Sequence, residues 1–285
     1  MRSSLRSRAL DSLRRQIIGR DLAFRSPYGL RHMFYADYTA SGRSLRSIEE
    51  KLLRIERSYA NTHTEDDYSG RYLTRLFHGA ERRIKELVNA GENGKIFVVG
   101  SGSTAALKKL QEIIGVSLPP VTRERLFGAA EAAGFDLAAA GEGRKPVVFI
   151  GPYEHHTNEI MWREAFAEVV VVGFGADGGL DPADLERKLD DPAFAGRPRF
   201  GSFSAGSNIT GIRTRVHDVS RACHRRGVPV FFDFAAVAPY VRIDIGPGDD
   251  DWLLDGGHDV ERDGADPFRW TTPEPALVIQ LDRRD

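Results

Sequence analysis

Four short motifs in this sequence carry side chains that bind anions or move protons. The first, GSGSTAAL at residues 100–107, is a Gly/Ser turn that leads into a helical pattern. Such a turn aims backbone N–H groups and the positive end of the helix dipole at one point. That point favours an anion, most naturally a phosphate, beside Ser103 and Thr104. The alternative is a tight turn, capped by Ser103, that binds no ligand.

Two histidines and an asparagine follow the next apolar runs. His155 and His156 lie in GPYEHHTNE, and Asn208 lies in SAGSNITG. An imidazole at a strand end can stack on a flat ring, bind a metal or move protons. The amide of Asn208 could bind a ligand hydroxyl, although asparagine also forms turns. The chain has no H-E-x-x-H motif and a single cysteine, Cys223, so the sequence predicts no metal site and no disulfide.

The fourth motif is a strand that ends on a carboxylate. In VPVFFDF, residues 228–234, Asp233 follows a fully apolar run. Burying a carboxylate is costly unless it is paired or hydrogen-bonded. A cationic ring nitrogen of a cofactor is one such partner, and a helix N-cap or an arginine salt bridge is the alternative. All four motifs follow predicted strands, so we expect them along one crevice at the carboxyl edge of a sheet.

The elements that position these motifs alternate along the chain. Apolar runs are separated by segments with helical spacing, which favours an α/β fold whose mainly parallel sheet is sandwiched by helices. Upstream, residues 44–61 and 72–91 have strong helical patterns, residues 10–24 fit an amphipathic helix, and residues 115–145 resemble a helical insertion. The predicted strands are residues 95–100, 146–151, 168–174, 199–204 and 228–234.

Composition narrows the functional classes. The 40 basic and 41 acidic residues leave a net charge of −1, so neither nucleic acid nor an anionic membrane is indicated as a partner. No apolar run approaches the roughly 18 residues that span a bilayer, and the start lacks the apolar core of a signal peptide. The sequence therefore predicts a cytoplasmic protein whose main partner is neither nucleic acid nor a membrane.

The order and spacing of the motifs resemble those of the class V aminotransferase and cysteine desulfurase family. These are fold-type I enzymes that use pyridoxal 5'-phosphate (PLP). The resemblance runs from MFYADYTASG, residues 33–42, to PYVRIDI, residues 239–245. It implies an amino-acid substrate, a homodimer and transamination or elimination at Cα or Cβ, including desulfuration. The cofactor-binding residues that it implies are Gly102, Ser103, Thr104, His155, Asn208 and Asp233.

The resemblance also gives each residue a role. Ser103 and Thr104 would hold the PLP phosphate, and His155, rather than His156, would stack on the ring and take part in proton transfer. Asn208 would lie near the ring oxygen. Asp233 would pair with the ring nitrogen and keep it protonated, which makes the ring an electron sink.

Two departures from the family pattern concern the chemistry. Desulfurases usually carry D-x-A-[QH] at the aspartate, whereas this chain has Ala236 at the last position. The family's Schiff-base lysine follows at a place that falls near His258 here, and no lysine follows Lys188. Without that lysine the covalent anchor and main acid/base are missing. We therefore expect a PLP-dependent transferase or lyase scaffold that is inactive in this chain.

These expectations divide the chain into three parts. Residues 1–60 would be an N-terminal helical segment on the substrate side, and residues 61–245 an incomplete PLP-binding large domain. Residues 246–285 read as an aberrant, disordered tail, with the family's small C-terminal domain missing. A frameshift in a GC-rich gene and a native tail both remain open as its origin.

Two alternatives to an enzyme stay open. One is a noncatalytic module that binds PLP or phosphate and has a native tail. The other is a dinucleotide-binding protein, because Gly100, Gly102 and Ala105 satisfy G-x-G-x-x-A. That fingerprint needs a second strand ending on an acidic residue about 20 positions later, where this chain has VSLPPVTRERLF.

Overall fold

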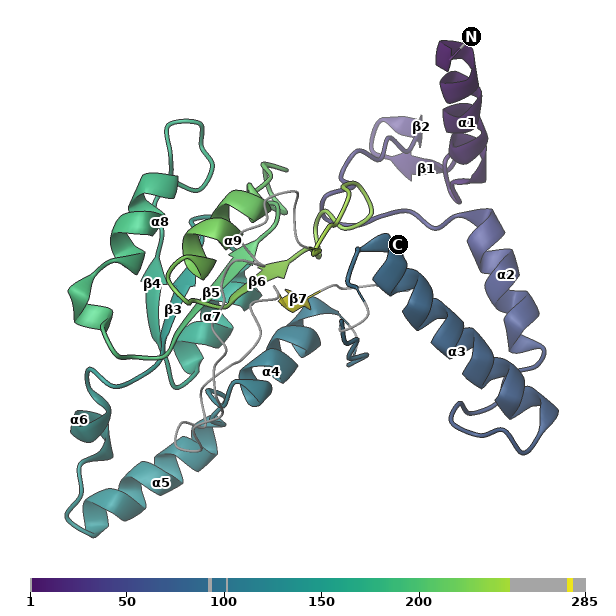
Figure 1. The fold of residues 1–285 in the computed structure, drawn as a ribbon. Coiled ribbons are helices and arrows are strands. Elements are labelled where there is room, and N and C mark those ends of the chain that lie inside the picture. Colours follow the sequence, from purple (N-terminus) through teal and green to yellow (C-terminus); the bar gives the residue numbers. More distant parts are fainter. Residues whose placement is uncertain (1, 92–93, 101, 247–275, 279–285) are drawn as a thin grey trace. The chain divides into compact units, whose positions relative to one another are not determined.

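The computed structural model describes residues 2–91, 94–100, 102–246 and 276–278. Its chain separates into two compact units, one holding the described residues up to Leu87 and the other those from Val88 onward (Figure 1). The first unit consists of α1 (Arg2–Gln16), the antiparallel hairpin β1 (Ala23–Ser26) and β2 (Gly29–His32), α2 (Arg46–Glu56) and α3 (Tyr68–Leu87). The helix predicted within 44–61 is confirmed, and the one predicted within 72–91 is confirmed in type but begins earlier, at Tyr68, and ends at Leu87.

The amphipathic helix expected over residues 10–24 is wrong at both ends. It begins earlier, at Arg2, and stops at Gln16, so that Leu22 lies beyond it. Gly19 has a φ of 77°, a left-handed conformation that glycine adopts readily and that cannot continue a right-handed helix. The N–H of Leu22 then bonds the carbonyl of Gly19 at 3.2 Å, and the chain turns into the hairpin.

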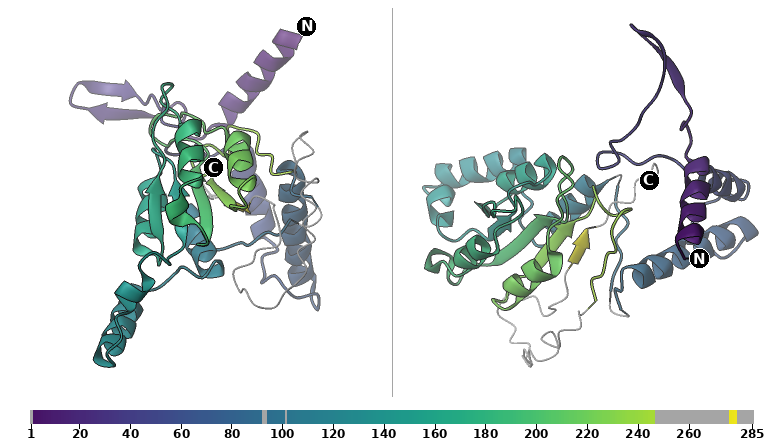
Figure 2. Two further views of the ribbon diagram at one scale, coloured as in Figure 1. Left: turned by 60° about the vertical axis from the view of Figure 1, so that its left-hand side comes forward. Right: turned by 90° about the horizontal axis from the view of Figure 1, so that it is seen from above.

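The second unit contains one parallel sheet. Its strands are β3 (Val147–Ile150), β4 (Glu168–Val171), β5 (Arg199–Ser204), β6 (Val230–Asp233) and β7 (Ala276–Val278). They lie in the order β4-β3-β5-β6-β7, and every pairing is parallel (Figure 1, Figure 2). The predicted α/β fold with a parallel sheet is confirmed.

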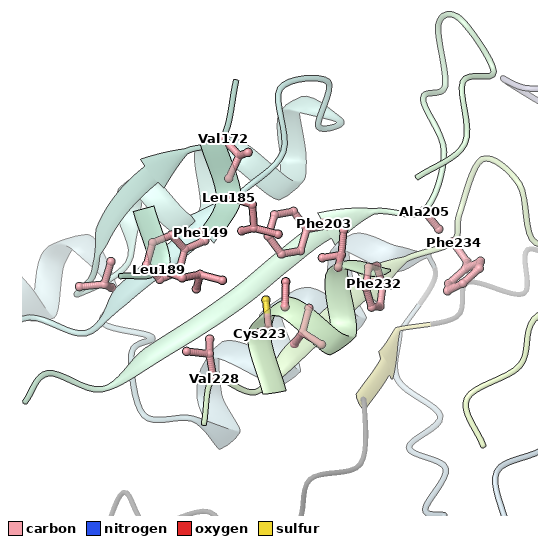
Figure 3. Packing of buried hydrophobic residues seen from close by; sticks show 14 of the residues in the cluster. Phe149, Val172, Leu185, Leu189, Phe203, Ala205, Cys223, Val228, Phe232 and Phe234 are labelled. Carbon is pink, nitrogen blue, oxygen red and sulfur yellow. The ribbon is translucent and has the colours of Figure 1, made fainter. Parts of the chain in front are cut away.

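Helices cover both faces of this sheet. Successive residues of a strand point to opposite faces, so Val147 and Phe149 enter one core and Val148 and Ile150 the other. The first core packs against α8 (Pro182–Leu189) and α9 (Val216–His224) (Figure 3). The second packs against α4 (Ser103–Ile113) and α7 (His156–Glu164). This double burial explains why the inner strand β3 reads as a continuous apolar run.

Cys223 belongs to the first of these cores. Its side chain is fully buried between α9 and the sheet (Figure 3). Burial raises the pKa of the thiol to about 12, so the thiol stays protonated and acts as a small apolar group. Cys223 is therefore a packing residue.

The strand order reverses between β3 and β5. From β3 the chain runs through α7 to β4 on one side, and then through α8 to β5 on the other side of β3. The loops after β3 and β5 therefore leave in opposite directions. In open α/β sheets, the carboxyl ends of the strands beside such a reversal form the usual ligand crevice.

The predicted strand at residues 95–100 is wrong. These residues form no regular secondary structure and pair with no described strand, and Phe97 and Val98 are 66% and 70% exposed. A strand needs hydrogen bonds to a neighbour, which local sequence does not reveal. The helical insertion is confirmed as α5 (Pro120–Ala132) and α6 (Leu137–Gly141).

The tail prediction falls largely outside the described residues. Of residues 246–285, the structure describes Gly246 and the strand β7, which pairs in parallel with β6. Strand β7 comes from ALVIQL, the one short apolar run of the tail. The expected disorder of the other residues stays a prediction.

The stability of the second unit should depend on the half-buried imidazole of His224. Burial lowers its pKa from 6.5 to about 4. Between these two pH values, the imidazole is protonated in the unfolded chain and neutral in the folded chain. Stability is therefore lost as pH falls from 6.5 towards 4, by about 2 kcal/mol after allowance for partial exposure. Urea unfolding at about pH 7.5 and about pH 4.5 should show this loss in the wild-type protein and not in His224→Gln.

The control is His217→Gln, which changes an exposed histidine on the same helix. It should keep the full acid sensitivity of the wild-type protein. An equal acid sensitivity in His224→Gln would show that other groups cause the loss.

Candidate functional site

The Gly/Ser turn forms an uncapped helix start. Gly102, with a φ of 98°, is the N-cap of α4 and offers no side-chain oxygen to the first amides of the helix. Within the described part of the chain, the N–H groups of Ser103 and Thr104 have no hydrogen-bond acceptor. Thr104 is exposed. Two free N–H groups at the positive end of the dipole form a place for an anion.

Ser103 does not cap this helix. It is the first helical residue, 6% exposed, and its hydroxyl donates to Asp233 Oδ1 at 2.8 Å. The alternative that the turn is merely capped by this serine is therefore wrong. The hydroxyl instead joins the start of α4 to the end of β6, two points separated by 130 residues.

Asp233 closes β6 with its carboxylate buried. The residue is 7% exposed, and its Oδ1 also accepts the N–H of Ala235 at 2.9 Å. Its backbone carbonyl accepts the N–H of Ala205 at 2.8 Å, which fixes the strand end against β5. Among the described residues, no hydrogen bond reaches Oδ2 and no arginine pairs with the carboxylate. One oxygen of a buried carboxylate is thus left for another donor.

His155 lies within the electrostatic reach of this carboxylate. It is the N-cap of α7, and its Nδ1 accepts the N–H of Thr157 at 3.3 Å, so the neutral ring carries its proton on Nε2. Burial and then the neighbouring His156 lower the pKa of His155, against the opposing charge of Asp233. The imidazole is therefore neutral near pH 7, as a ring that stacks or exchanges a proton requires.

The two histidines are close to each other. The ring centroids of His155 and His156 lie 4.0 Å apart with an interplanar angle of 37°. His155 is half-buried and His156 is exposed. The geometry therefore gives His155 the more protected position, although the assignment of a role to it rests on the sequence resemblance.

Glu154 is a residue that the sequence did not single out. Its Oε1 accepts the N–H groups of Gly151 and Ser204, each at 2.9 Å. Its Oε2 accepts the hydroxyl of Ser204 and the amide of Asn158, each at 2.6 Å. A Cβ at Gly151 would lie 2.5 Å from Oε1, so glycine is needed for this approach. Glu154 thus ties the ends of β3 and β5 to the start of α7, at the point where the strand order reverses.

The charge state of Glu154 reflects two opposing effects. Burial raises the pKa of its carboxyl group, while the hydrogen bonds from Ser204, Asn158 and Gly151 act in the other direction. The only signal in the sequence was its place immediately before the two histidines. Its four donors come from positions as far as 50 residues away, which no local pattern reveals.

Glu154→Gln should lower the free energy of unfolding by about 2 kcal/mol, because an NH₂ group would face two of these donors. Urea unfolding followed by circular dichroism measures the effect. Glu159→Gln, five positions further along the chain and within α7, is the matched control, since Glu159 forms an exposed pair with Arg163, worth about 0.5 kcal/mol or less. Equal effects of the two substitutions would contradict the role given to Glu154.

Asn208 makes no hydrogen bond to the other predicted residues within the described part of the chain. It is half-buried in a turn where Ser207 Oγ accepts the N–H groups of Ile209 and Thr210 at 3.2 Å each. Its side chain makes no hydrogen bond to any other described residue. The structure therefore brings together Ser103 and Asp233 by contact and His155 by charge, but it does not join Asn208 to them.

Lys188 is held at the far edge of the sheet. Its Nζ donates to the carbonyl of Val171 at 2.6 Å and to Asp184 at 2.7 Å. Val171 belongs to β4, three positions from β6 in the sheet order. At about 4.8 Å per strand spacing this is roughly 14 Å. Lys188 cannot serve the Asp233 site from there.

The dinucleotide alternative loses its structural context. Its fingerprint needs a strand with an acidic end about 20 residues after the turn. The structure has α5 at that place.

Within the described ranges, no group of three or more His, Cys, Asp or Glu side chains is suited to a metal ion. No helix in these ranges has the length and apolarity to cross a membrane.

Comparisons with known proteins identify relatives of this arrangement. The family model for class-V aminotransferases matches residues 128–260. A probable cysteine desulfurase of Halalkalibacterium halodurans is 23% identical over 231 residues, which cover 79% of this chain and 50% of the relative. One from Streptomyces coelicolor is 22% identical, with 79% and 49% covered. The chain thus spans about half the length of the curated relatives it matches.

Solved structures show the same fold. An apo cysteine desulfurase from Thermococcus onnurineus NA1 superposes with a TM-score of 0.59 at 16% identity, covering 82% of this chain and 50% of that protein. A NifS-like protein from Rickettsia africae gives a TM-score of 0.51 at 15% identity, covering 75% and 51%. The chain is thus similar in sequence to class V aminotransferases and cysteine desulfurases, and it shares their fold.

Proposed function

We propose that this chain binds PLP at the carboxyl edge of its sheet, as a member of an amino-acid-directed family. The observation that carries the proposal is the buried carboxylate of Asp233, whose Oδ2 has no described partner, close to the uncapped start of α4. A cofactor with a phosphate and a cationic ring nitrogen fits both features. A buried carboxylate favours such a cation because each compensates the desolvation of the other.

The residues present fit PLP in their donor and acceptor types. The N–H groups of Ser103 and Thr104 would bind the phosphate, Asp233 Oδ2 would accept the ring N–H, and the neutral imidazole of His155 would lie against the ring. Bound PLP supplies an electron sink for chemistry at the Cα of an amino acid. Asn208 would lie near the ring oxygen, as the resemblance implies.

The proposal places this cofactor without a covalent lysine. No lysine follows Lys188 in the sequence, and Lys188 is engaged at β4. A lysine normally provides both the covalent link and the main acid/base of such chemistry. We therefore expect these 285 residues to hold PLP noncovalently and to convert amino acids very slowly, whether by transamination, elimination or desulfuration.

A binding titration tests the proposal. PLP, pyridoxal without the phosphate, and inorganic phosphate would each be added to the purified chain, with bound ligand measured by equilibrium dialysis. PLP should bind, pyridoxal should bind at least roughly 10-fold more weakly because it lacks the charged phosphate contacts, and phosphate should compete with PLP. Protection from proteolysis by NAD(P) but not by PLP would overturn the proposal in favour of a dinucleotide protein.

The proposal includes a second copy of the chain as a partner and the cytoplasm as the compartment. The observation that supports self-association is the apolar surface of the first unit, where no residue of α2 is buried and Leu53 is 64% exposed. Light scattering on the purified chain should give the mass of a dimer. A monomer at all concentrations would contradict it.

A further inference from the structure

We propose that Ser103 is a positioning residue for Asp233 and not a phosphate ligand through its hydroxyl. The inference rests on the proposed function, because it concerns how this chain presents Asp233 to a cationic ring nitrogen. It changes the role expected for Ser103 from the sequence. The phosphate would be held by the turn's N–H groups and by the hydroxyl of Thr104.

The argument begins with the single proton of a serine hydroxyl. A hydroxyl has one O–H donor, and a phosphate at neutral pH offers mainly acceptors. In the structure that proton goes to Asp233 Oδ1 at 2.8 Å, within a buried contact. The same proton cannot also bond a phosphate oxygen. Thr104, in contrast, is exposed and its hydroxyl makes no hydrogen bond to any described residue.

The bond also fixes which carboxylate oxygen faces the site. Oδ1 accepts from both Ser103 and the N–H of Ala235, at 2.8 and 2.9 Å. Two donors on one oxygen hold the side-chain torsion of Asp233 and leave Oδ2 for the incoming cation. Removing the Ser103 donor leaves a single bond from the backbone, about which the carboxylate can rotate.

The position of Ser103 in the turn links the start of α4 to the end of β6. Ser103 is the first residue of α4, so its N–H lies at the positive end of the helix while its side chain turns inward to β6. Ser103 thus connects the start of α4, where the phosphate would bind, to Asp233, which would bind the ring nitrogen. Phosphate binding by the turn and orientation of Asp233 become coupled through the position of Ser103.

The test separates the two roles with two ligands. PLP would be compared with an analogue in which a C–H group replaces the ring nitrogen, so that the phosphate is retained and the partner of Asp233 is lost. Ser103→Ala should weaken PLP binding roughly 10-fold, the size expected for a charge-assisted hydrogen bond, and leave binding of the analogue within about twofold. Thr104→Ala should weaken both ligands by similar factors.

The PLP affinity of a double variant distinguishes a positioning role from a general structural defect. In the Asp233→Asn background, Ser103→Ala should have almost no further effect on PLP affinity, because groups that act together are not additive. Retained binding of the analogue shows that Ser103→Ala is folded. Equal loss of both ligands in Ser103→Ala, or no loss of either, would overturn the positioning role.

The outcomes also separate this inference from the proposed function. If the wild-type chain binds neither PLP nor the analogue, the proposed function fails and the inference falls with it. If the wild-type chain binds both equally, PLP still binds but Asp233 does not recognise the ring nitrogen, which overturns the inference alone.

Discussion

Asp233→Asn is expected to weaken PLP binding by roughly 30-fold, equivalent to about 2 kcal/mol, because it removes the charge that would face the ring nitrogen. The substitution keeps the shape of the side chain. Asn Oδ1 can still accept the hydroxyl of Ser103 and the N–H of Ala235, so the end of β6 should keep its bonds. What changes is Oδ2, which becomes an NH₂ donor that cannot accept a ring N–H.

Absorbance titration with PLP measures this loss. Asp181→Asn is the matched control, because Asp181 caps α8 by accepting the N–H of Ala183 at 2.9 Å, and asparagine caps helices equally well. The control should keep wild-type affinity. Wild-type affinity in Asp233→Asn as well would show that the buried carboxylate does not meet the cofactor.

Trp162→Ala is expected to lower the free energy of unfolding by about 4 kcal/mol, the largest effect on stability that we predict. Trp162 is 0% exposed in the core between α7 and the sheet, and its indole N–H donates to Asn158 Oδ1 at 3.0 Å. Alanine would leave a cavity and remove one donor to Asn158. Because Asn158 also bonds Glu154, the loss would loosen the loop that carries His155.

Chemical denaturation followed by circular dichroism tests this expectation. Ile160→Ala lies two positions away on the same helix, where the side chain is 54% exposed, and should cost well under half as much. Trp162→Phe, which keeps most of the ring, should fall between them. A loss below roughly 1 kcal/mol for Trp162→Ala would mean that α7 is not packed on the sheet as described.

Much of the fold was predictable because the sheet is buried on both faces. VVFI, RFGSFS and VFFD read as apolar runs, and the structure has strands there within two residues of the predicted bounds. The secondary-structure predictions that were wrong concern segments whose structure depends on contacts with another segment. Residues 95–100 have the same apolar character but find no strand to pair with among the described residues. The helix expected over residues 10–24 ends at Gln16, because Ile17 and Ile18 pair with Leu45 and Ser44, a contact that the local sequence does not show.

The site was predictable in its parts and not in their connections. Ser103, His155 and Asp233 follow from residue type at the ends of strands and turns. The bond between Ser103 and Asp233 joins two segments 130 residues apart, and two of the four bonds to Glu154 come from Ser204, 50 residues away. Such contacts arise from tertiary packing, so local sequence patterns do not predict them. The bond from Ser103 also redirects a residue that the motif alone assigned to the phosphate.

The measurement that tests the central claim most directly is borohydride reduction of the PLP-saturated chain, followed by peptide mapping. Asp233, His155 and the turn at Ser103 and Thr104 should hold PLP without a covalent bond. The account therefore predicts a spectrum like that of free PLP, loss of the cofactor on dialysis and no modified peptide after reduction. A reduced PLP adduct on a lysine at one defined position would contradict it.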